Sequence, residues 1–196
     1  SFHPPHLSWY QLTIEPNTVF NKRPPTLPVE DALADIQDRG ELLLENQGYA
    51  QYEVSAYSRP ELQCQHNLNY WSFGDYLALG AGAHGKITTA DGSIRRYAKT
   101  RAPQDYLQGE RYTASKRVLN QGELIGEFMM FALRLNNGFS TQRFEQVTGL
   151  SADQLRPKVQ SLADRELLST DGDNIRATPL GRRFLDSVIA EFLPND

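Results

Sequence analysis

The stretch His66–Lys86, "HNLNYWSFGDYLALGAGAHGK", is the part of the chain richest in groups that can carry chemistry. It holds two of the four histidines, the neighbouring aromatics Tyr70 and Trp71, and a run of small residues, "GAGAHG", at positions 80–85. Small residues let a backbone approach a ligand or another strand closely. The stretch is therefore either a ligand site or a well-packed strand and turn.

The sequence before this stretch predicts a strand, a helix and a second strand. Residues 7–14 are rich in β-branched and aromatic residues, which favours a strand. A proline-rich loop leads to a helix that begins at Pro28 and stops at Gly48. Residues 49–57 predict the second strand. A connection of this length allows a parallel crossover, so this region favours an α/β fold.

The sequence after the stretch predicts a β-hairpin. We expect a short strand over residues 76–79, before the small-residue loop. Residues 87–89 and 94–98 flank Asp91-Gly92, a strong signal for a two-residue turn. Residues 103–121 are polar and charged, which is typical of a linker or a short helix.

The last 75 residues predict a helical domain with a small β-wing. Residues 138–150 predict a short helix. The inward positions of the other three helices are Leu124, Phe128, Phe131 and Leu135; Leu155, Val159 and Leu162; and Leu180, Phe184, Val188 and Phe192. Gly149 is a helix stop, Ser151 with Gln154 resembles a capping box, and Pro157 shifts or kinks the third helix. Residues 169–178 predict the wing. Together these elements indicate a winged-helix-like module.

Composition excludes several classes of protein. Net charge is −4 and the pI is about 5.6, without the basic surplus typical of nucleic-acid binding. No run of 18 apolar residues predicts a membrane span, and no basic leader with an apolar core precedes the first strand. A single cysteine, Cys64, cannot form an internal disulfide, which favours the cytoplasm. The chain enters a strand within seven residues, so we expect it to be cut from a larger protein.

The winged-helix-like module also raises a non-enzymatic interpretation, in which it binds DNA or a partner protein. The wing tip carries Asp171 and Asp173, which repel phosphate. Arg176, Arg182 and Arg183 are the local basic surplus. We therefore expect no nucleic-acid partner, and packing or partner docking is the better interpretation.

Three residues of the quoted stretch are the first candidates for chemistry. A neutral His66 imidazole can ligate a metal or haem iron, or shuttle a proton. Spacing alone favours a structural histidine that bonds the backbone at the start of a strand. Tyr70 and Trp71 can line a flat apolar ligand pocket, or they can be ordinary aromatic residues of the core.

The small-residue loop and other candidates carry weaker signals. Gly80, Gly82 and Gly85 surround His84, but the spacing fits neither a dinucleotide fingerprint nor a P-loop. Cys64 and His66 would share a face of a strand, yet the paired spacing of a zinc site is absent.

Glu53 stands apart because it lies inside a strand that looks buried. A buried acid is rare without a partner. We expect Glu53 to lie at the mouth of a barrel or to pair with an arginine.

Three segments of the chain resemble a known family. They are "PPHLSWYQLTIEPNT" (4–18), "YEVSAYSRPELQCQHNLNYW" (52–71) and "FGDYLALGAGAHG" (73–85). They resemble the second half of the oxygen-independent coproporphyrinogen III oxidase-like radical-SAM proteins, and among these the HemW-type haem chaperones. The resemblance covers essentially the whole chain.

This resemblance implies a fold and a set of cofactors. The expected fold is α/β: the second half of a partial (β/α) radical-SAM barrel with a β-hairpin over residues 1–100, a linker or helix over 101–120, and a winged-helix-like domain over 121–196. The full-length parent is expected to bind a [4Fe–4S] cluster and S-adenosylmethionine. Such a cluster needs three cysteine thiolates, whereas this chain has only Cys64, so we expect no catalysis from it alone.

The resemblance also implies site residues. A haem-binding motif maps onto His66, Asn67, Tyr70 and Trp71, with His66 as an iron ligand. A loop near the cofactors maps onto Gly80, Gly82, Ala83, His84 and Gly85, and Glu53 is grouped with that loop. His84 is the second candidate for iron ligation.

Three functions follow, in order of preference. The first is haem binding and delivery to respiratory acceptor proteins, with membrane proteins among the partners and a cytoplasmic location that extends to the membrane through them. The second is the porphyrin-biosynthetic coproporphyrinogen oxidase, and the third is the non-enzymatic module. Missing barrel strands would leave an open sheet edge, so self-association is also expected.

Overall fold

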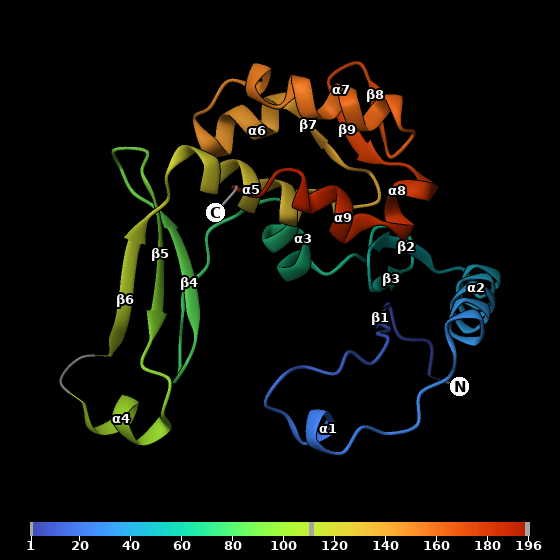
Figure 1. The fold of residues 1–196 in the computed structure, drawn as a ribbon, viewed down its shortest axis with the longest axis horizontal. Helices are drawn as coiled ribbons and strands as arrows, with labels where there is room; N and C mark the ends of the chain where they lie inside the picture. Colours follow the sequence, from blue (N-terminus) through green and yellow to red (C-terminus); the bar gives the residue numbers. More distant parts are fainter. Residues whose placement is uncertain (1, 110–111, 195–196) are drawn as a thin grey trace. The chain divides into compact units, whose positions relative to one another are not determined.

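The computed structural model describes residues 2–109 and 112–194, which form two compact units (Figure 1). The units meet in the sequence between Cys64 and Gln65. Each has its own elements and is described by itself. The domain limits expected near residues 100 and 121 remain a prediction.

The first unit contains a three-stranded sheet of order β1-β3-β2. Its strands are β1 (His6–Ser8), β2 (Ala50–Glu53) and β3 (Ala56–Ser58), and both pairings are antiparallel. The predicted parallel crossover is therefore wrong. The expected strand 49–57 turns at Val54-Ser55 and forms a hairpin, which places β3 between β1 and β2.

The first strand is shorter than the sequence suggests. Residues 7–14 were expected to be strand, but the ladder ends at Ser8, and the Trp9 N–H donates only to the Ser55 carbonyl, 2.8 Å away. The reason is the length of its partner. β3 has three residues, so the backbone of residues 10–14 has no neighbouring strand with which to pair.

Two helices lie between β1 and β2: α1 (Val19–Lys22) and α2 (Glu30–Asn46). α2 confirms the predicted helix, and the chain leaves it through Gly48, whose φ of 80° is left-handed. The Trp9 ring lies against Gly40, where a side chain would overlap the indole. Within the described residues of α2, no side chain is fully buried, so its predicted apolar face is only partly covered.

The second unit begins with α3 (Gln65–Trp71), where the sequence had suggested a strand. Residues 76–79 contribute a single bridge, between Tyr76 and Lys86, in place of the strand expected there. The predicted hairpin is confirmed as β4 (His84–Thr88) and β5 (Ile94–Lys99).

The segment expected to be a linker or a short helix contains the helix and also adds a third strand to this hairpin. It contains α4 (Pro103–Gln108) and β6 (Thr113–Val118), and β6 pairs with β5 in the sheet of order β4-β5-β6 (Figure 1). Alternation in β6 was hidden in the sequence because all six of its side chains are exposed. Polar sequence therefore concealed a strand.

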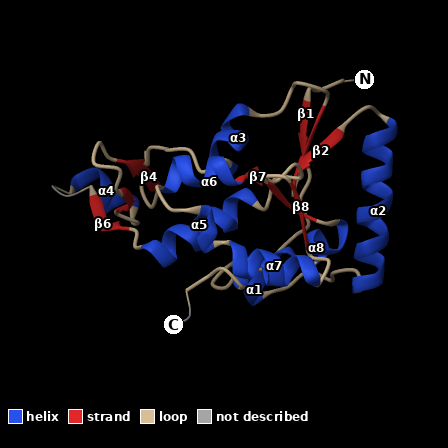
Figure 2. Ribbon diagram, turned by 90° about the horizontal axis from the view of Figure 1, so that it is seen from above, coloured by secondary structure: helices blue, strands red, loops and turns tan. Residues whose placement is uncertain are grey.

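The remaining elements form the winged-helix-like module, with α5, α6 and α7 grouped around a small sheet (Figure 2). They are α5 (Gln121–Ala132), β7 (Phe139–Ser140), α6 (Thr141–Thr148), η1 (Ala152–Gln154), α7 (Arg156–Asp164), β8 (Leu168–Asp171), β9 (Asn174–Ala177), α8 (Pro179–Arg183) and α9 (Leu185–Ala190). The sheet order is β7-β9-β8, so the predicted wing is confirmed as the β8–β9 hairpin.

Local signals set the helix ends of this module. Asn120 and Glu123 form a capping box at the start of α5, and Gly149 ends α6 with a φ of 71°. The box expected at Ser151 is wrong: its hydroxyl accepts from the Asp153 N–H and caps the short η1. Pro157 lies in the first turn of α7, so it shifts the helix start without a kink.

A continuous apolar core fills the second unit. Phe128 is fully buried, and its ring lies edge-to-face with Phe73, Phe139 and Phe144 at centroid distances of 5.6, 4.8 and 5.0 Å.

The last predicted helix is wrong in one respect. It is broken at Phe184 into α8 and α9, and both Phe184 and Leu180 are exposed because the break turns them outward.

Among the described residues, no helix combines the length and apolar character needed to cross a membrane. The observed fold is thus mixed α/β, with three open sheets rather than a closed barrel.

Candidate functional site

The motif His66–Trp71 is helical, and this decides which of its side chains share a face. In a helix, positions three and four apart are neighbours, so His66, Asn67 and Tyr70 lie together. The centroids of the His66 and Tyr70 rings are 6.4 Å apart. His66 is exposed and lies in the first turn of α3. Cys64 precedes the helix, so the strand face that it was expected to share with His66 does not exist.

The two aromatics of the motif pack on the core of the second unit. The Tyr70 ring meets Phe131 of α5 edge-to-face, with centroids 4.9 Å apart, and Trp71 lies 6.0 Å from the same ring. Both residues are half-buried against the core. In this structure Tyr70 and Trp71 anchor α3 to α5, whereas His66 remains open.

The chain leaves α3 through a tightly held turn. The Arg143 guanidinium donates through Nε and Nη2 to the Ser72 carbonyl, at 3.2 and 2.8 Å. Phe73 follows with a φ of 61°, a left-handed conformation that is costly for a bulky residue. The Asn69 amide then donates to the Asp75 carbonyl, 3.1 Å away. The orientation of α3 is therefore fixed at its C-terminal end.

A buried lysine joins this turn to β4. The Lys86 ammonium lies 3.0 Å from Asp75 Oδ1 and 4.1 Å from the Phe73 ring centroid, and its side chain is 1% exposed. Burial lowers the pKa of Lys86, and Asp75 opposes this by stabilising the ammonium. Partial burial would raise the pKa of Asp75, but hydrogen bonds from Thr88 and Lys86 hold it below its usual value.

A second polar group contacts the outer side of Tyr70. Tyr76 stacks on Tyr70 with centroids 4.6 Å apart, and its hydroxyl accepts a hydrogen bond from Arg96 of β5. Arg96 Nε in turn lies 2.7 Å from Glu127 Oε2 of α5. Burial raises the pKa of Tyr76 to about 12. Sequence analysis missed Arg96 and Glu127, because no local pattern links them to the motif.

The small-residue loop is accounted for by backbone conformation and packing. Gly80 and Gly82 have φ values of 96° and 70°, which side chains rarely adopt. Gly85 lies beneath the Tyr97 ring, and a Cβ there would overlap that ring. Ala83 accepts a backbone hydrogen bond from Lys99.

Of the loop residues, His84 alone offers an exposed functional side chain. It opens β4 at an edge of its sheet and pairs with Ala98 of β5.

Glu53 belongs to the other unit. It is 2% exposed, and the Ser55 N–H donates to its Oε2 at 3.3 Å. Burial raises the pKa of the adjacent Tyr57 to about 12, and the charges of Glu41 and Glu53 add to the effect.

The described residues offer no candidate metal centre built from three or more His, Cys, Asp or Glu side chains. Cys64 is a free, half-buried thiol. A [4Fe–4S] cluster needs at least three thiolates, so the residues present do not fit it.

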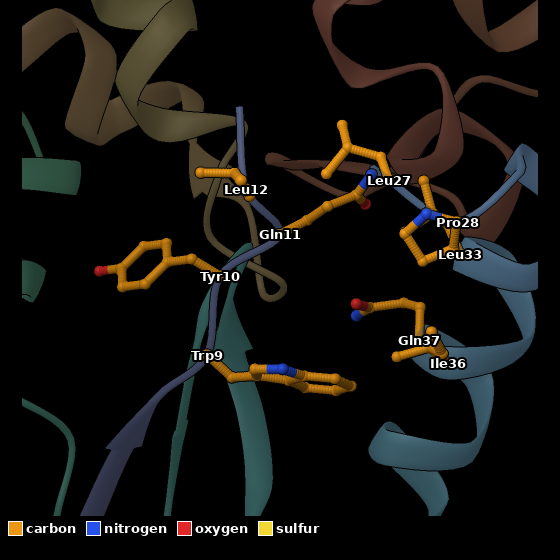
Figure 3. Close-up of a pocket in the computed structure, with 9 residues that line it drawn as sticks. All are labelled: Trp9, Tyr10, Gln11, Leu12, Leu27, Pro28, Leu33, Ile36 and Gln37. Atoms are coloured by element: carbon orange, nitrogen blue, oxygen red, sulfur yellow. The ribbon is translucent and has the colours of Figure 1, made fainter. Parts of the chain in front are cut away.

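A small apolar pocket lies in the first unit, and none of the predicted site residues lines it (Figure 3). Residues 9–12 line one side and residues of the α2 region line the other, namely Leu27, Pro28, Leu33, Ile36 and Gln37. Its volume of about 170 Å³ is below the range of about 300–1,000 Å³ that is typical of ligand pockets. We therefore do not assign the functional site to it.

Comparison with known proteins gives these features a family. Residues 119–184 match the family model described as the HemN C-terminal domain. The chain is 49% identical to the heme chaperone HemW of Escherichia coli (strain K12) over 97% of its own length and 50% of that protein. It is 45% identical to the heme chaperone HemW of Haemophilus influenzae, over 98% of the chain and 50% of the relative. The chain is therefore similar, over almost its whole length, to half of a HemW-type heme chaperone.

A solved structure supports the fold of this chain. Coproporphyrinogen III oxidase (HemN) from Escherichia coli, a radical-SAM enzyme, matches it with a TM-score of 0.71 over 97% of this chain and 48% of that one. Sequence identity is 18%, so this likeness shows the fold alone. The chain aligns with the C-terminal half of that enzyme and spans about half the length of the curated relatives it matches.

Proposed function

We propose that this chain carries the haem-binding segment of a HemW-type haem chaperone, with His66 as the ligand to haem iron. The observation that carries the proposal is the contrast within α3: His66 is exposed, while Tyr70 and Trp71 hold the helix on the core. Two relatives that match almost the whole chain are named heme chaperones.

The geometry of α3 suits a reversible ligand. A neutral imidazole is a common axial ligand to haem iron, and the rest of the helix must hold it still for ligation to be specific. Anchors at Tyr70, Trp71 and the Ser72 carbonyl supply that rigidity. Because His66 is exposed, an acceptor protein can reach haem bound there, so the haem can be transferred to it.

The other predicted residues take secondary places in the proposal. Asn67 lies one residue beyond His66 and is half-buried, so we assign it a contact to haem rather than to iron. His84 is the alternative iron ligand because it too is exposed. We retain the loop of Gly80, Gly82, Ala83 and Gly85, together with Glu53, as a proposal for the cofactor side of the whole protein.

The remaining functions of the whole protein are also proposals. The [4Fe–4S] cluster and S-adenosylmethionine would be held by residues outside this chain, so no radical step is assigned to it. Acceptor proteins, membrane-protein partners and a cytoplasmic location stay predictions. Self-association does too, and a monodisperse 22.2 kDa species in light scattering would contradict it.

The alternative functions have less support. A coproporphyrinogen oxidase is favoured only by the structural neighbour, whose 18% identity carries the fold and not the activity. A DNA-binding module is opposed by the exposed Asp171 and Asp173 at the β8–β9 wing.

The proposal is tested by titrating haem into the wild-type chain, His66→Ala and His84→Ala, with the Soret band as readout. We expect one equivalent to shift the band in the wild type and in His84→Ala, and no such shift in His66→Ala. Both histidines are exposed, so neither change disturbs the core and each controls for the other. Loss of the shift in His84→Ala alone would identify His84, at the start of β4, as the iron ligand. Equal behaviour of all three chains would refute ligation by either residue.

A further inference from the structure

The Tyr70 ring is held by a polar network that begins on a different part of the chain. We propose that Arg96 of β5 and Glu127 of α5 are positioning residues for the haem motif, acting on His66 through Tyr76 and Tyr70. This inference rests on the proposed haem-binding function and deepens it, since no relative's name or family model points to these two residues.

Contacts run without a gap from the ion pair to the motif. Glu127 Oε2 accepts from Arg96 Nε at 2.7 Å, and Arg96 donates to the Tyr76 hydroxyl. The Tyr76 ring lies 4.6 Å from the Tyr70 ring, centroid to centroid. Tyr70 is one helical turn from His66, and their ring centroids are 6.4 Å apart.

Arg96 also fixes the wall against which Tyr70 leans. Its guanidinium carbon lies 5.5 Å from the Tyr76 ring centroid and 5.6 Å from that of Phe131. Phe131 is the core residue that meets Tyr70 edge-to-face. Arg96 therefore ties together β5, the turn after α3, and α5, which are the three elements around Tyr70.

The burial of the pair is what indicates a role beyond stability. The side chains of Arg96 and Glu127 are only 17% and 14% exposed. Removing two charges from water costs about as much as their attraction returns, so well-packed apolar residues usually serve stability equally well. What apolar residues cannot supply is a directed hydrogen bond to the Tyr76 hydroxyl. We therefore assign the pair to fixing Tyr76, and through it the direction of Tyr70 and His66.

Glu127 has a second basic neighbour, Arg117, which also pairs with another carboxylate. Arg117 of β6 lies 3.5 Å from Glu127 Oε1 and bonds to Glu123. When Glu127 is replaced, Arg117 keeps Glu123 as its partner. Replacement of Arg96 and Glu127 together thus leaves no buried charge alone, whereas either single change leaves one.

The test uses the double variant Arg96→Met/Glu127→Leu in the whole chain. We expect it to keep its melting temperature within a few degrees and to lose haem to apomyoglobin about 10-fold faster or more, the usual scale for outer-shell changes at a metal site. We also expect its Soret band to depart from the wild-type position. Tyr76→Phe, which removes only the hydroxyl, should reproduce the faster loss in part.

Two controls separate positioning from mere stability. Val159→Ala lies in the buried core of α7, away from the motif, and should lower the melting temperature without changing the Soret band or haem loss. Arg96→Lys keeps the charge but not the planar guanidinium that bonds both partners. Its rate of haem loss should therefore lie between that of the wild type and that of the double variant.

Outcomes for the two proposals are distinct. A double variant that retains haem as the wild type does, while His66→Ala still abolishes the Soret shift, would overturn the positioning role and leave the proposed function standing. Faster haem loss from Val159→Ala to the same extent would overturn it too. A wild-type chain that gives no Soret shift at all would overturn both proposals.

Discussion

Residues 2–64 and residues 65–194 differ in how much of a core each region completes. In the second region apolar side chains from α5, α6, α7 and α9 meet in one buried cluster, and Tyr70 and Trp71 of α3 pack against it. In the first, the buried apolar side chains lie in the small sheet and at Tyr49 just before it, and α2, 17 residues long, has no fully buried residue among those described. Helix stability comes mainly from packing of an apolar face, so α2 gains less stability from packing than α5 does.

The difference teaches where the candidate site draws its rigidity. The motif of His66, Asn67, Tyr70 and Trp71 opens the region with the complete core, and α3 packs on α5. A short helix of seven residues is not stable alone in water. The orientation of α3 therefore depends on its packing against α5 of the winged-helix-like module.

The largest effect is expected when the two regions are separated. A chain of residues 65–196 should fold cooperatively, since it retains the whole buried cluster, while residues 1–64 should lack a cooperative thermal transition. Circular dichroism melting of each piece checks this. A cooperative transition in residues 1–64 with none in residues 65–196 would reverse the comparison.

The next largest effect is expected from shortening one side chain in each region, because the loss of stability should differ between the two regions. Phe128→Ala removes a fully buried ring and should cost about 3–5 kcal/mol of unfolding free energy. Leu43→Ala, at a site on α2 that is 62% exposed, should cost about 0.5 kcal/mol or less. Urea denaturation measures both. Similar losses for the two variants would mean that α2 belongs to a packed core.

A smaller effect is expected at the ion pair beside the motif. Asp75→Asn leaves the buried Lys86 ammonium without its carboxylate and should cost about 1–3 kcal/mol at pH 7. The pKa of Asp75 is lowered in the folded state, so its contribution is complete above the unfolded value near 3.8 and is lost as pH falls through the folded value. The gap in stability between wild type and variant should therefore begin to narrow below about pH 4 and close as pH falls through the folded pKa of Asp75.

Urea midpoints at pH 7 and at pH 3 test this prediction. Asp171→Asn, at the exposed wing tip, is the matched control and should change stability at pH 7 by about 0.5 kcal/mol or less. A gap between wild type and Asp75→Asn that widens in acid would contradict the assigned direction.

The smallest effect compares two equivalent glycines. Gly48 and Gly149 end α2 and α6 with φ values of 80° and 71°, and neither has an atom within 4 Å of where a Cβ would lie. Alanine should cost about 1–2 kcal/mol of backbone strain at either site. Gly149→Ala should lower the global unfolding free energy, whereas Gly48→Ala should appear mainly as faster hydrogen exchange in α2. Equal global losses would show that the two regions unfold together.

Sequence reasoning succeeded where a local signal and the tertiary environment agree. Gly149 and the Asp91-Gly92 turn act through their own backbone preferences, so the end of α6 and the β4–β5 hairpin were predicted correctly. At Pro157 the structure decided between the two expected outcomes, a shifted helix start and a kink, in favour of the shifted start. Sequence reasoning failed where pairing decided the outcome. β6 carries an exposed, polar sequence and is a strand only because β5 offers it an edge.

The candidate site shows the same division. Its residues were found from a resemblance in the sequence, but the strand expected at His66 was wrong, and the partners Arg96, Glu127 and Arg143 were not foreseen. Arg96 and Arg143 lie 30 and 77 positions after His66 in the sequence. At such separations no periodic pattern connects them to the motif.

By itself the sequence determined the Asp91-Gly92 turn, the end of α6 at Gly149, the apolar stripe of α5 and the likeness to HemW-type proteins, because these features depend on residue type and local spacing. Only the tertiary structure decided that β1 pairs with β3, that α3 is a helix pinned on α5, and that His66 is open while Tyr70 and Trp71 are held. Those choices depend on contacts between distant residues, whose free energy exceeds any local preference of a seven-residue segment.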